Sequence, residues 1–392
     1  MRPLDGIKVV TFEHAIAAPF CTRQLADLGA RVIKVERPGT GDFARNYDER
    51  VSGLASHFVW TNRSKESITL DVKQPAALEI VHRLLADADV FVQNLAPGAT
   101  QRLGLDYQTL HGRHPKLIVC DISGYGLDGP FRDKKAYDLL IQSESGFLSI
   151  TGSESEPAKA GCSIADIAAG VYGYSNILAA LIERGRTGLG RRIDISMLES
   201  MVEWMSYPLY YAIDGQAPPK RAGAAHATIY PYGPFKIGDG KTVMLGLQNE
   251  REWKIFCEAV ICRPELADDE RFNSNSRRVE HREELAQLIT GTFSSLTTGD
   301  VIGRIDEAGI ANARMNDMQA VWAHEQLAAR SRWTRVATSA GEIPALYPPG
   351  LTPEDKPRMD PVPALGEHTD SILCELGYDD GQIRAMRDAG AV

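Results

Sequence analysis

The chain has 392 residues, of which 43% are hydrophobic and 24% are charged, and its formal net charge at pH 7 is −9. This composition is ordinary for a globular protein, and the length suggests more than one domain. An acidic chain disfavours nucleic acid as a partner, because binding to phosphates needs a basic face. The sequence holds no uninterrupted run of 18 apolar residues, and its first residues lack the apolar core of a secretory signal. We therefore predict a cytoplasmic protein with no membrane partner.

The cysteines and histidines are scattered along the chain. No two cysteines form a C-x-x-C pair, and the histidines include no H-E-x-x-H sequence. These patterns disfavour a disulfide framework and a zinc site, so we predict reduced thiols and no metal.

Short apolar runs alternate with helical patterns through the first two hundred residues. This alternation predicts an α/β fold with a Rossmann-like, doubly wound parallel sheet. Sheets of this kind bind ligands at the carboxyl ends of their strands. The expected strands are 7–12, 31–36, 67–72, 89–93, 116–122 and 191–196, and the expected helices are 20–28, 75–86, 165–184 and 197–211.

A segment rich in Pro, Gly and Ala at 215–225 predicts a linker between two domains. We expect a large Rossmann-like domain at 1–215 plus 330–392, and a small α+β domain at 225–325. The proline-rich segment 343–363 is expected to run extended over a surface, because proline breaks helices and central strands. Further elements are expected as a strand at 241–247 and as helices near 250–260, 281–293, 300–308, 369–376 and 380–389.

Asp166 lies at the predicted start of the long helix, in the sequence Ser163-Ile-Ala-Asp166. This spacing is typical of a capping box, in which the acidic residue merely satisfies the helix end. The neighbouring residues are small and apolar, however, and would leave the carboxylate partly desolvated. A poorly solvated carboxylate can attack an activated acyl group. The residues alone leave both interpretations open.

Two other patterns suggest an anionic ligand. Residues 124–129 match the G-x-G-x-x-G fingerprint of dinucleotide sites, but a polar segment follows where that fingerprint needs a helix, so we predict a loop. Basic residues near the predicted strand ends suit phosphate groups, although solvated surface positions explain each of them equally well. These residues are Lys34, Arg37, Arg102, Lys134 and Lys135.

Several segments stand out when they are read together along the chain. They are 3–10 (PLDGIKVV), 28–45 (LGARVIKVERPGTGDFAR), 62–65 (NRSK), 68–73 (ITLDVK), 93–98 (QNLAPG), 102–104 (RLG), 122–126 (ISGYG), 136–139 (AYDL), 164–166 (IAD) and 188–195 (GLGRRIDI). In this order they resemble the class III CoA-transferases of the CaiB/BaiF type over essentially the whole chain. The resemblance implies an interlocked homodimer that uses acyl-CoA as a substrate and holds no tightly bound cofactor.

The resemblance also implies that Asp166 is the nucleophile, which forms a mixed anhydride and then an aspartyl-CoA thioester. Ile16 stands where some family members have glutamine, so the hydrogen bond of that glutamine is not expected. The glycine-rich active-site loop of formyl-CoA transferase is not reproduced at 246–249. The implied contacts to CoA are His14, Ile16, Ala17, Arg37, Leu70, Asp71, Val72, Lys73, Asn94, Leu95, Ala96, Arg102, Lys135, Ala136, Tyr137 and Asp138.

The same fold hosts α-methylacyl-CoA racemases, in which a histidine and an aspartate act as an acid/base pair. Tyr137 occupies the position of that histidine, directly before Asp138. Tyrosine has a pKa near 10 and is a poor substitute for histidine in proton transfer. The transferase interpretation is therefore favoured, with the racemase as the alternative and a non-catalytic acyl-CoA-binding homologue as a third possibility.

The segments 207–211 (YPLYY), 226–232 (HATIYPY) and 246–253 (GLQNEREW) resemble the branch of the family that handles short dicarboxylates. This resemblance implies succinyl-CoA as the donor and itaconate or mesaconate as the acceptor, with formate, oxalate, carnitine or malate as alternatives. A second carboxylate needs a cation or several hydrogen-bond donors. The candidates for this role are Arg45, His226, Tyr230 and Gln248.

Overall fold

The computed structural model describes residues 1–392, and the chain forms two compact units. Unit 1 comprises Met1–Gly146, Ala160–Ser206 and Glu325–Val392, and unit 2 comprises Phe147–Lys159 and Tyr207–His324. The domain limits expected from the sequence stay a prediction.

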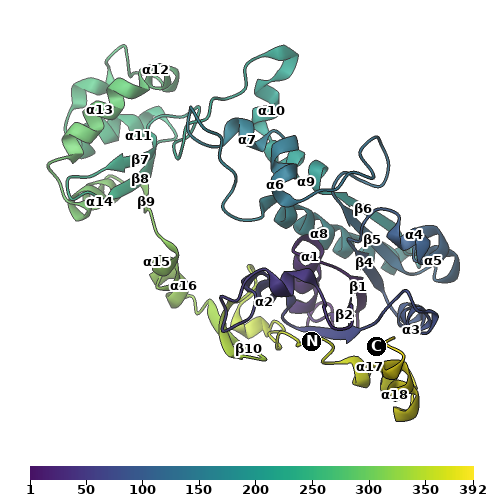
Figure 1. Ribbon diagram of the computed structural model, residues 1–392. Helices are drawn as coiled ribbons and strands as arrows, with labels where there is room; N and C mark the ends of the chain where they lie inside the picture. The colour runs from purple at the N-terminus through teal and green to yellow at the C-terminus, as the bar shows by residue number, and fades with distance from the viewer. The chain divides into compact units, whose positions relative to one another are not determined.

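Unit 1 is built around a six-stranded sheet whose strands all run parallel (Figure 1). Apolar sequences such as KVVTF and VFVQ form its central strands, as expected for strands that are covered on both faces. The predicted parallel α/β sheet is thus confirmed, and its strands form close to the expected positions. In sequence order the strands are β1 (Lys8–Phe12), β2 (Arg31–Glu36), β3 (Lys65–Thr69), β4 (Val90–Gln93), β5 (Ile118–Ser123) and β6 (Arg192–Ser196).

The strand order is β3-β2-β1-β4-β5-β6, so the direction in which the chain adds strands reverses between β1 and β4. A doubly wound sheet opens a ligand-binding crevice at this reversal, outside the carboxyl ends of the strands.

The helices of unit 1 are α1 (Ala17–Asp27), η1 (Phe43–Asn46), α2 (Ser56–Asn62), α3 (Pro75–Ala86), α4 (Ala99–Arg102), α5 (Tyr107–Arg113), α6 (Asp138–Glu144), α8 (Ile164–Thr187), α9 (Met197–Met205), α16 (Glu325–Ala329), η5 (Pro353–Asp355), α17 (Thr369–Glu375) and α18 (Asp380–Asp388).

The long helix α8 packs closely against α1 because glycines on α8 leave room for the backbone of α1. A Cβ atom on Gly170 would lie 2.8 Å from the carbonyl oxygen of Ala17, and one on Gly173 would lie 3.1 Å from Sγ of Cys21.

The prediction of a single helix over 197–211 is wrong. The helix is interrupted at Ser206, whose φ of +45° is incompatible with a continuous right-handed helix.

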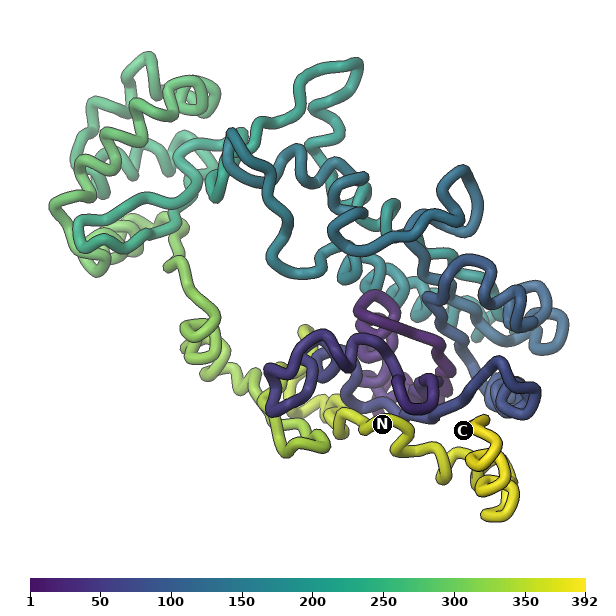
Figure 2. Tube along the Cα trace, viewed as in Figure 1, coloured from purple at the N-terminus to yellow at the C-terminus, as the bar shows by residue number.

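The last part of the chain returns to unit 1 and covers the β3 side of the sheet (Figure 2). The backbone N–H of His368 donates to the carbonyl oxygen of Ser67, and the N–H of Thr69 donates to Oγ1 of Thr369 at 3.0 Å. The proline-rich segment contributes to an antiparallel hairpin that the sequence did not predict. Its strands are β10 (Trp333–Thr338) and β11 (Gly341–Leu346).

Unit 2 contains a three-stranded antiparallel sheet of order β7-β8-β9. Its core is aromatic, and Trp253, Phe256, Phe272 and Phe293 are fully buried. Its strands are β7 (Tyr232–Lys236), β8 (Thr242–Gly246) and β9 (Ala311–Arg314). Its helices are α7 (Phe147–Ile150), α10 (Tyr207–Tyr211), η2 (Ile213–Gly215), α11 (Glu250–Ile255), η3 (Phe256–Val260), η4 (Pro264–Ala267), α12 (Asn275–Glu280), α13 (Arg282–Phe293), α14 (Thr298–Glu307) and α15 (Met318–Trp322).

By length and composition, α8 is long and apolar enough to cross a membrane, with a mean hydropathy of 1.3. Length and composition therefore do not rule out a spanning helix, contrary to the prediction from the sequence. One such helix is weak evidence for a membrane protein, because the core helix of a folded unit passes the same test.

Candidate active site

The loops that follow β1 and β4 are joined at the point where the strand order reverses. The backbone N–H of His14 donates to Oδ1 of Asn94 at 2.9 Å, and Nδ2 of Asn94 donates to the carbonyl oxygen of His14 at 2.9 Å. The loop after β1 carries His14, and the loop after β4 carries Asn94, Leu95 and Ala96, all of which the resemblance implied as contacts to CoA. The sheet therefore brings them together at its ligand-binding edge.

Asp166 lies in the first turn of α8, and its side chain does not take part in a capping box. Ser163 occupies the N-cap position, but its side chain makes no capping hydrogen bond, so the capping-box interpretation is wrong. The N–H of Ala165 instead donates to Oδ1 of Asp138 at 2.8 Å. Because Asp138 satisfies this helix end, the carboxylate of Asp166 is left for other contacts.

The surroundings of Asp166 raise its pKa to about 7. Burial is the largest cause, the negative charge of Asp138 adds to it, and a hydrogen bond from the backbone of Ala17 acts in the opposite direction. A carboxylate with this pKa is far more basic than one on the surface, and it is still substantially ionised near neutral pH. Both properties suit a nucleophile.

Asp138 is itself fixed by a buried side chain. Its Oδ2 accepts a hydrogen bond from Nε2 of Gln142 at 2.7 Å, and Oε1 of Gln142 accepts one from the N–H of Ala160 at 2.9 Å. The loop 124–129, which follows β5, approaches Ala136 so closely that a Cβ on Gly124 would lie 2.2 Å from the Cβ of Ala136. Residues 124–129 form a loop, as predicted, and no helix follows directly.

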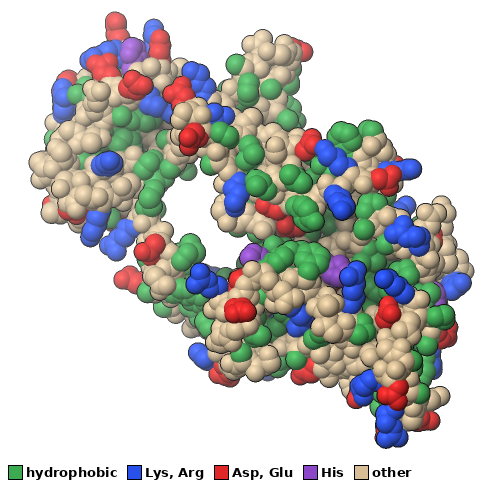
Figure 3. All heavy atoms as spheres, in the orientation of Figure 1, with side chains coloured by type: hydrophobic (Ala, Val, Ile, Leu, Met, Phe, Trp, Pro, Cys, Tyr) green, Lys and Arg blue, Asp and Glu red, His purple; other side chains and the backbone are tan.

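Most of the implied CoA residues follow strands of the sheet and are at least partly exposed. Basic side chains gather on the visible face of unit 1 (Figure 3), and Arg37, Lys73, Arg102 and Lys135 are exposed. The side chain of Leu70 packs in the hydrophobic core, so only its backbone is left for a ligand. The remaining positions of this group are Ile16 and Ala17 at the start of α1, Asp71 and Val72 after β3, Leu95 and Ala96 after β4, and Tyr137 before α6.

Tyr47 also belongs to this site, although the sequence analysis did not identify it. Its pKa is raised to about 12 by burial and by the charges of Asp42 and Asp166. The phenol therefore stays neutral and keeps a proton to donate. Tyr47 lies against Phe43, which stacks on the ring of His14 with centroids 5.3 Å apart. No periodic pattern in the sequence marks Tyr47, because it is brought to Asp166 only by the fold.

Arg45 has its hydrogen-bonding groups occupied within unit 1. Its Nε and Nη2 donate to the carboxylate of Glu36 at 2.9 and 2.7 Å, and both Nη atoms lie 3.3 Å from the carbonyl oxygen of Pro363. The guanidinium also stacks over Phe58 at 3.8 Å. A substrate carboxylate would have to displace Glu36 to bind Arg45.

The other three candidates for a second carboxylate lie in unit 2. Nδ1 of His226 accepts hydrogen bonds from the N–H groups of Thr228 and Ile229 at 3.2 and 3.1 Å, which fixes the tautomer with a proton on Nε2. Burial and the charge of Arg282 lower the pKa of His226, so it stays neutral and acts as a donor. Tyr230 is buried in the core, whereas Gln248 is exposed.

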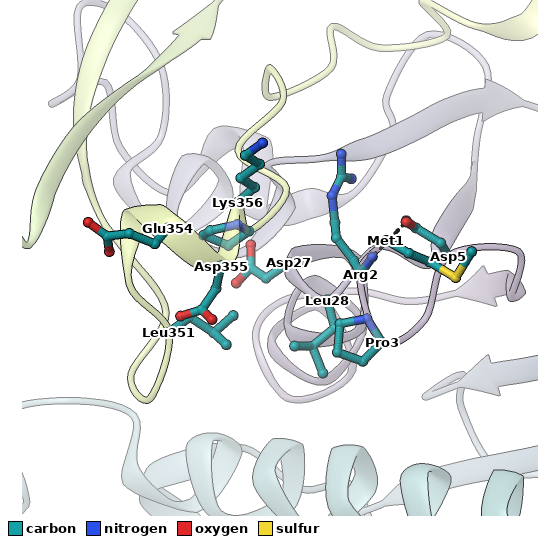
Figure 4. Close-up of a pocket in the computed structure, with 11 residues that line it drawn as sticks. Met1, Arg2, Pro3, Asp5, Asp27, Leu28, Leu351, Glu354, Asp355 and Lys356 are labelled. Atoms are coloured by element: carbon teal, nitrogen blue, oxygen red, sulfur yellow. Dashed lines mark hydrogen bonds between the residues drawn. The ribbon is translucent and has the colours of Figure 1, made fainter.

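A cavity of about 580 Å³ lies near the amino ends of β1 and β2 (Figure 4). It is lined by residues that precede β1 and β2, such as Pro3 and Leu28, and by residues of the C-terminal return, such as Asp355 and Lys356. Ligands of parallel sheets bind at the carboxyl ends of the strands. This cavity is therefore not part of the site around Asp166.

The model of CoA-transferase family III matches residues 4–369. The succinyl-CoA:glutarate CoA-transferase of Mus musculus is 35% identical over 100% of this chain and 91% of its own length. The succinyl-CoA:mesaconate CoA-transferase of Haloarcula hispanica is 32% identical over 99% of this chain and 100% of its own length. A CaiB/BaiF family protein from Brucella suis has a similar crystal structure, with a TM-score of 0.84 and 34% identity over 96% of this chain and 99% of that one. The chain therefore belongs to CoA-transferase family III, the CaiB/BaiF family, and is a class III CoA-transferase.

Proposed function

We propose that this chain moves CoA from succinyl-CoA to a five-carbon dicarboxylate by way of Asp166. The observation that carries the proposal is the placement of Asp166, whose carboxylate is freed from helix capping and has a pKa of about 7. The choice of substrates is supported by three relatives whose names specify succinyl-CoA with glutarate, mesaconate or D-citramalate. Itaconate, which the resemblance implied, is a dicarboxylate of the same length.

The reaction begins when a carboxylate oxygen of Asp166 attacks the thioester carbonyl of succinyl-CoA. The C–S bond breaks, CoA leaves as a thiolate, and a mixed anhydride forms between succinate and Asp166. The thiolate then attacks the Asp166 carbonyl and releases succinate, which leaves an aspartyl-CoA thioester. The acceptor carboxylate repeats both steps in reverse and leaves as the new CoA thioester. No net proton or electron is exchanged, but water must be kept from the anhydride.

The proposed binding roles follow from charge. Arg37, Lys73, Arg102 and Lys135 are exposed cations that suit the phosphates of CoA. For the distal carboxylate of the acceptor, the neutral Nε2–H of His226 and the amide of Gln248 are donors that the protein does not occupy in unit 2. Because Arg45 is paired with Glu36, we assign it to holding its loop rather than to the acceptor.

The test is to mix the protein with succinyl-CoA and single acids, and to follow new CoA thioesters by mass spectrometry. The panel comprises glutarate, itaconate, mesaconate, citramalate, malate, oxalate and carnitine. New thioesters of the five-carbon acids, absent with Asp166→Asn, support the proposal. Products only with oxalate or carnitine would refute the acceptor class. Deuterium uptake into an α-methylacyl-CoA without transfer would establish the racemase alternative, and activity unaffected by Asp166→Asn would refute the role of Asp166.

We also propose that the chain forms an interlocked homodimer. The second segment of unit 2, which starts at Tyr207, leaves several large apolar side chains exposed, an arrangement that is typical of surfaces covered by a partner chain. These are Tyr207, Leu209, Tyr210, Tyr211 and Ile213. Sedimentation at micromolar concentration should give twice the mass of one chain, and a compact monomer would refute the dimer.

A further inference from the structure

The turn between β1 and α1 holds a residue in a left-handed conformation. Ala15 has φ +60°, which is unfavourable for a residue with a Cβ atom. Its N–H donates to Oδ1 of Asp42 at 3.1 Å, and the N–H of the preceding residue, His14, donates to Oδ1 of Asn94 at 2.9 Å. Two residues further on, the backbone of Ala17 forms the hydrogen bond to Asp166. The conformation of Ala15 therefore determines where that donor points.

Asp42 is fixed in turn by charges that are fully buried. Its Oδ2 accepts a hydrogen bond from Nζ of Lys34 at 2.7 Å, and both side chains are 0% exposed. Nζ of Lys34 also lies 3.4 Å from Glu13, which accepts a hydrogen bond from Lys65 at 2.6 Å. The positive charges of the two lysines and the negative charges of Asp42 and Glu13 sum to zero. Buried ion pairs of this kind contribute little net stability, because desolvation offsets their attraction.

We infer that Asp42 and Lys34 are positioning residues, which hold Ala15 in its left-handed turn so that the N–H of Ala17 faces Asp166 before substrate binds. This inference rests on the proposed role of Asp166 as the nucleophile. In that role the Asp166 carbonyl oxygen becomes negatively charged each time a thiolate or carboxylate attacks it. A donor that is already aimed at the oxygen stabilises that charge without rearrangement.

The inference predicts the direction of a change in pH dependence. The groups that face Asp166 are Asp138 from α6, the phenol of Tyr47 and the N–H of Ala17. Tyr47 stays neutral through the working range, because its pKa is raised to about 12. Of these groups, only the hydrogen bond from Ala17 lowers the pKa of Asp166. Loss of this bond must therefore raise that pKa and move the acid limb of the reaction to higher pH.

The test compares Asp42→Ala with Asp42→Asn and follows two readouts. The first is the rate at which succinyl-CoA loads CoA onto the protein, measured by mass spectrometry between pH 5 and 9. For Asp42→Ala we expect a rate about 10-fold lower at pH 7 and an acid limb about one pH unit higher. The reason is that the charged carboxylate of Asp166 loses its hydrogen bond from the backbone of Ala17. Asp42→Asn keeps an oxygen that accepts from Ala15, so its limb should stay close to that of the unmodified protein.

The second readout is amide hydrogen exchange of residues 13–19, which does not depend on activity. Exchange should be faster in Asp42→Ala than in the unmodified protein. Asp27→Asn is the matched control, because it removes a buried, ion-paired carboxylate at the other end of α1. It should lower stability without moving the acid limb. If Asp42→Ala does not fold, Lys34→Met/Asp42→Leu removes the pair with similar volume and carries the same expectations.

Unchanged exchange in a folded variant that lacks Asp42, or an acid limb that stays in place, would overturn the inference. Failure of the unmodified protein to load CoA at any pH is a different result, because it refutes the proposed function. The exchange measurement still decides in that case whether Asp42 holds the turn.

Discussion

The negative charge of Asp138 raises the pKa of Asp166, while Asp138 itself accepts the backbone N–H of the residue directly before Asp166. One carboxylate thus satisfies the start of α8 and makes its neighbour more basic. Burial of Asp166 is the larger cause of its raised pKa, and Asp138 adds to it.

Replacing Asp138 by Asn should lower the pKa of Asp166. The amide oxygen of Asn still accepts the N–H of Ala165, but the charge is gone. We expect the acid limb of kcat/KM to move down by about one pH unit, as expected for removal of a close like charge. Glu144→Gln on the same helix is the control, because Glu144 is exposed and paired with Lys134. A limb that stays in place or rises would contradict this prediction.

The raised pKa of Asp166 also costs stability at high pH. Its pKa is about 7 in the folded protein and 3.8 for an unperturbed Asp side chain, so between these pH values the folded state holds a proton that the unfolded state has lost. Stability is therefore lost as the pH rises from about 4 to about 7. Asp166→Asn should be inactive but more stable at pH 8 by up to about 4 kcal/mol. Urea unfolding at pH 8 and at about pH 4 checks this, and equal differences at both pH values would argue against it.

Gly170→Ala tests the close approach of α1 to α8. The new Cβ would lie 2.8 Å from the carbonyl oxygen of Ala17, so α1 must shift and the hydrogen bond from Ala17 to Asp166 must weaken. We expect kcat to fall by at least 10-fold, in line with the loss of one aimed donor. Gly185→Ala on the same helix meets no neighbouring atom and should be neutral or stabilising by about 0.5–1 kcal/mol. Similar activity of both variants would show that the approach is not required.

The buried pair of Lys65 and Glu13 should be strongly coupled. Lys65 is fully buried and its pKa is lowered to about 8, with burial as the largest cause. Lys65→Met removes the ammonium group that lies 2.6 Å from Glu13, and the unpaired buried carboxylate should cost about 3–5 kcal/mol of unfolding free energy. The double variant Lys65→Met/Glu13→Gln should recover part of this loss. A double-mutant cycle by urea unfolding measures the coupling, and strictly additive effects would refute it.

The sequence determined the main sheet and the identity of the candidate nucleophile. The central strands of a parallel sheet are covered on both faces, so β1 and β4 read as short apolar runs. β2 and β6 alternate apolar with polar residues instead, and both patterns were visible without the structure. Asp166 was marked by the order of motifs around it. The hairpin of β10 and β11 was missed, because its half-exposed strands and Pro344 do not form such a run.

Only the tertiary structure decided how charges pair. Glu13, Lys34, Asp42 and Lys65 follow or belong to different strands, and they meet because β1, β2 and β3 are neighbours in the sheet. The same holds for Arg45, whose pairing with Glu36 the sequence did not reveal, and for Asp138, which replaces Ser163 as the cap of α8. Hydrophobic burial repeats along a helix or strand and leaves a periodic trace in the sequence, whereas an ion pair depends on two side chains meeting in space and leaves none.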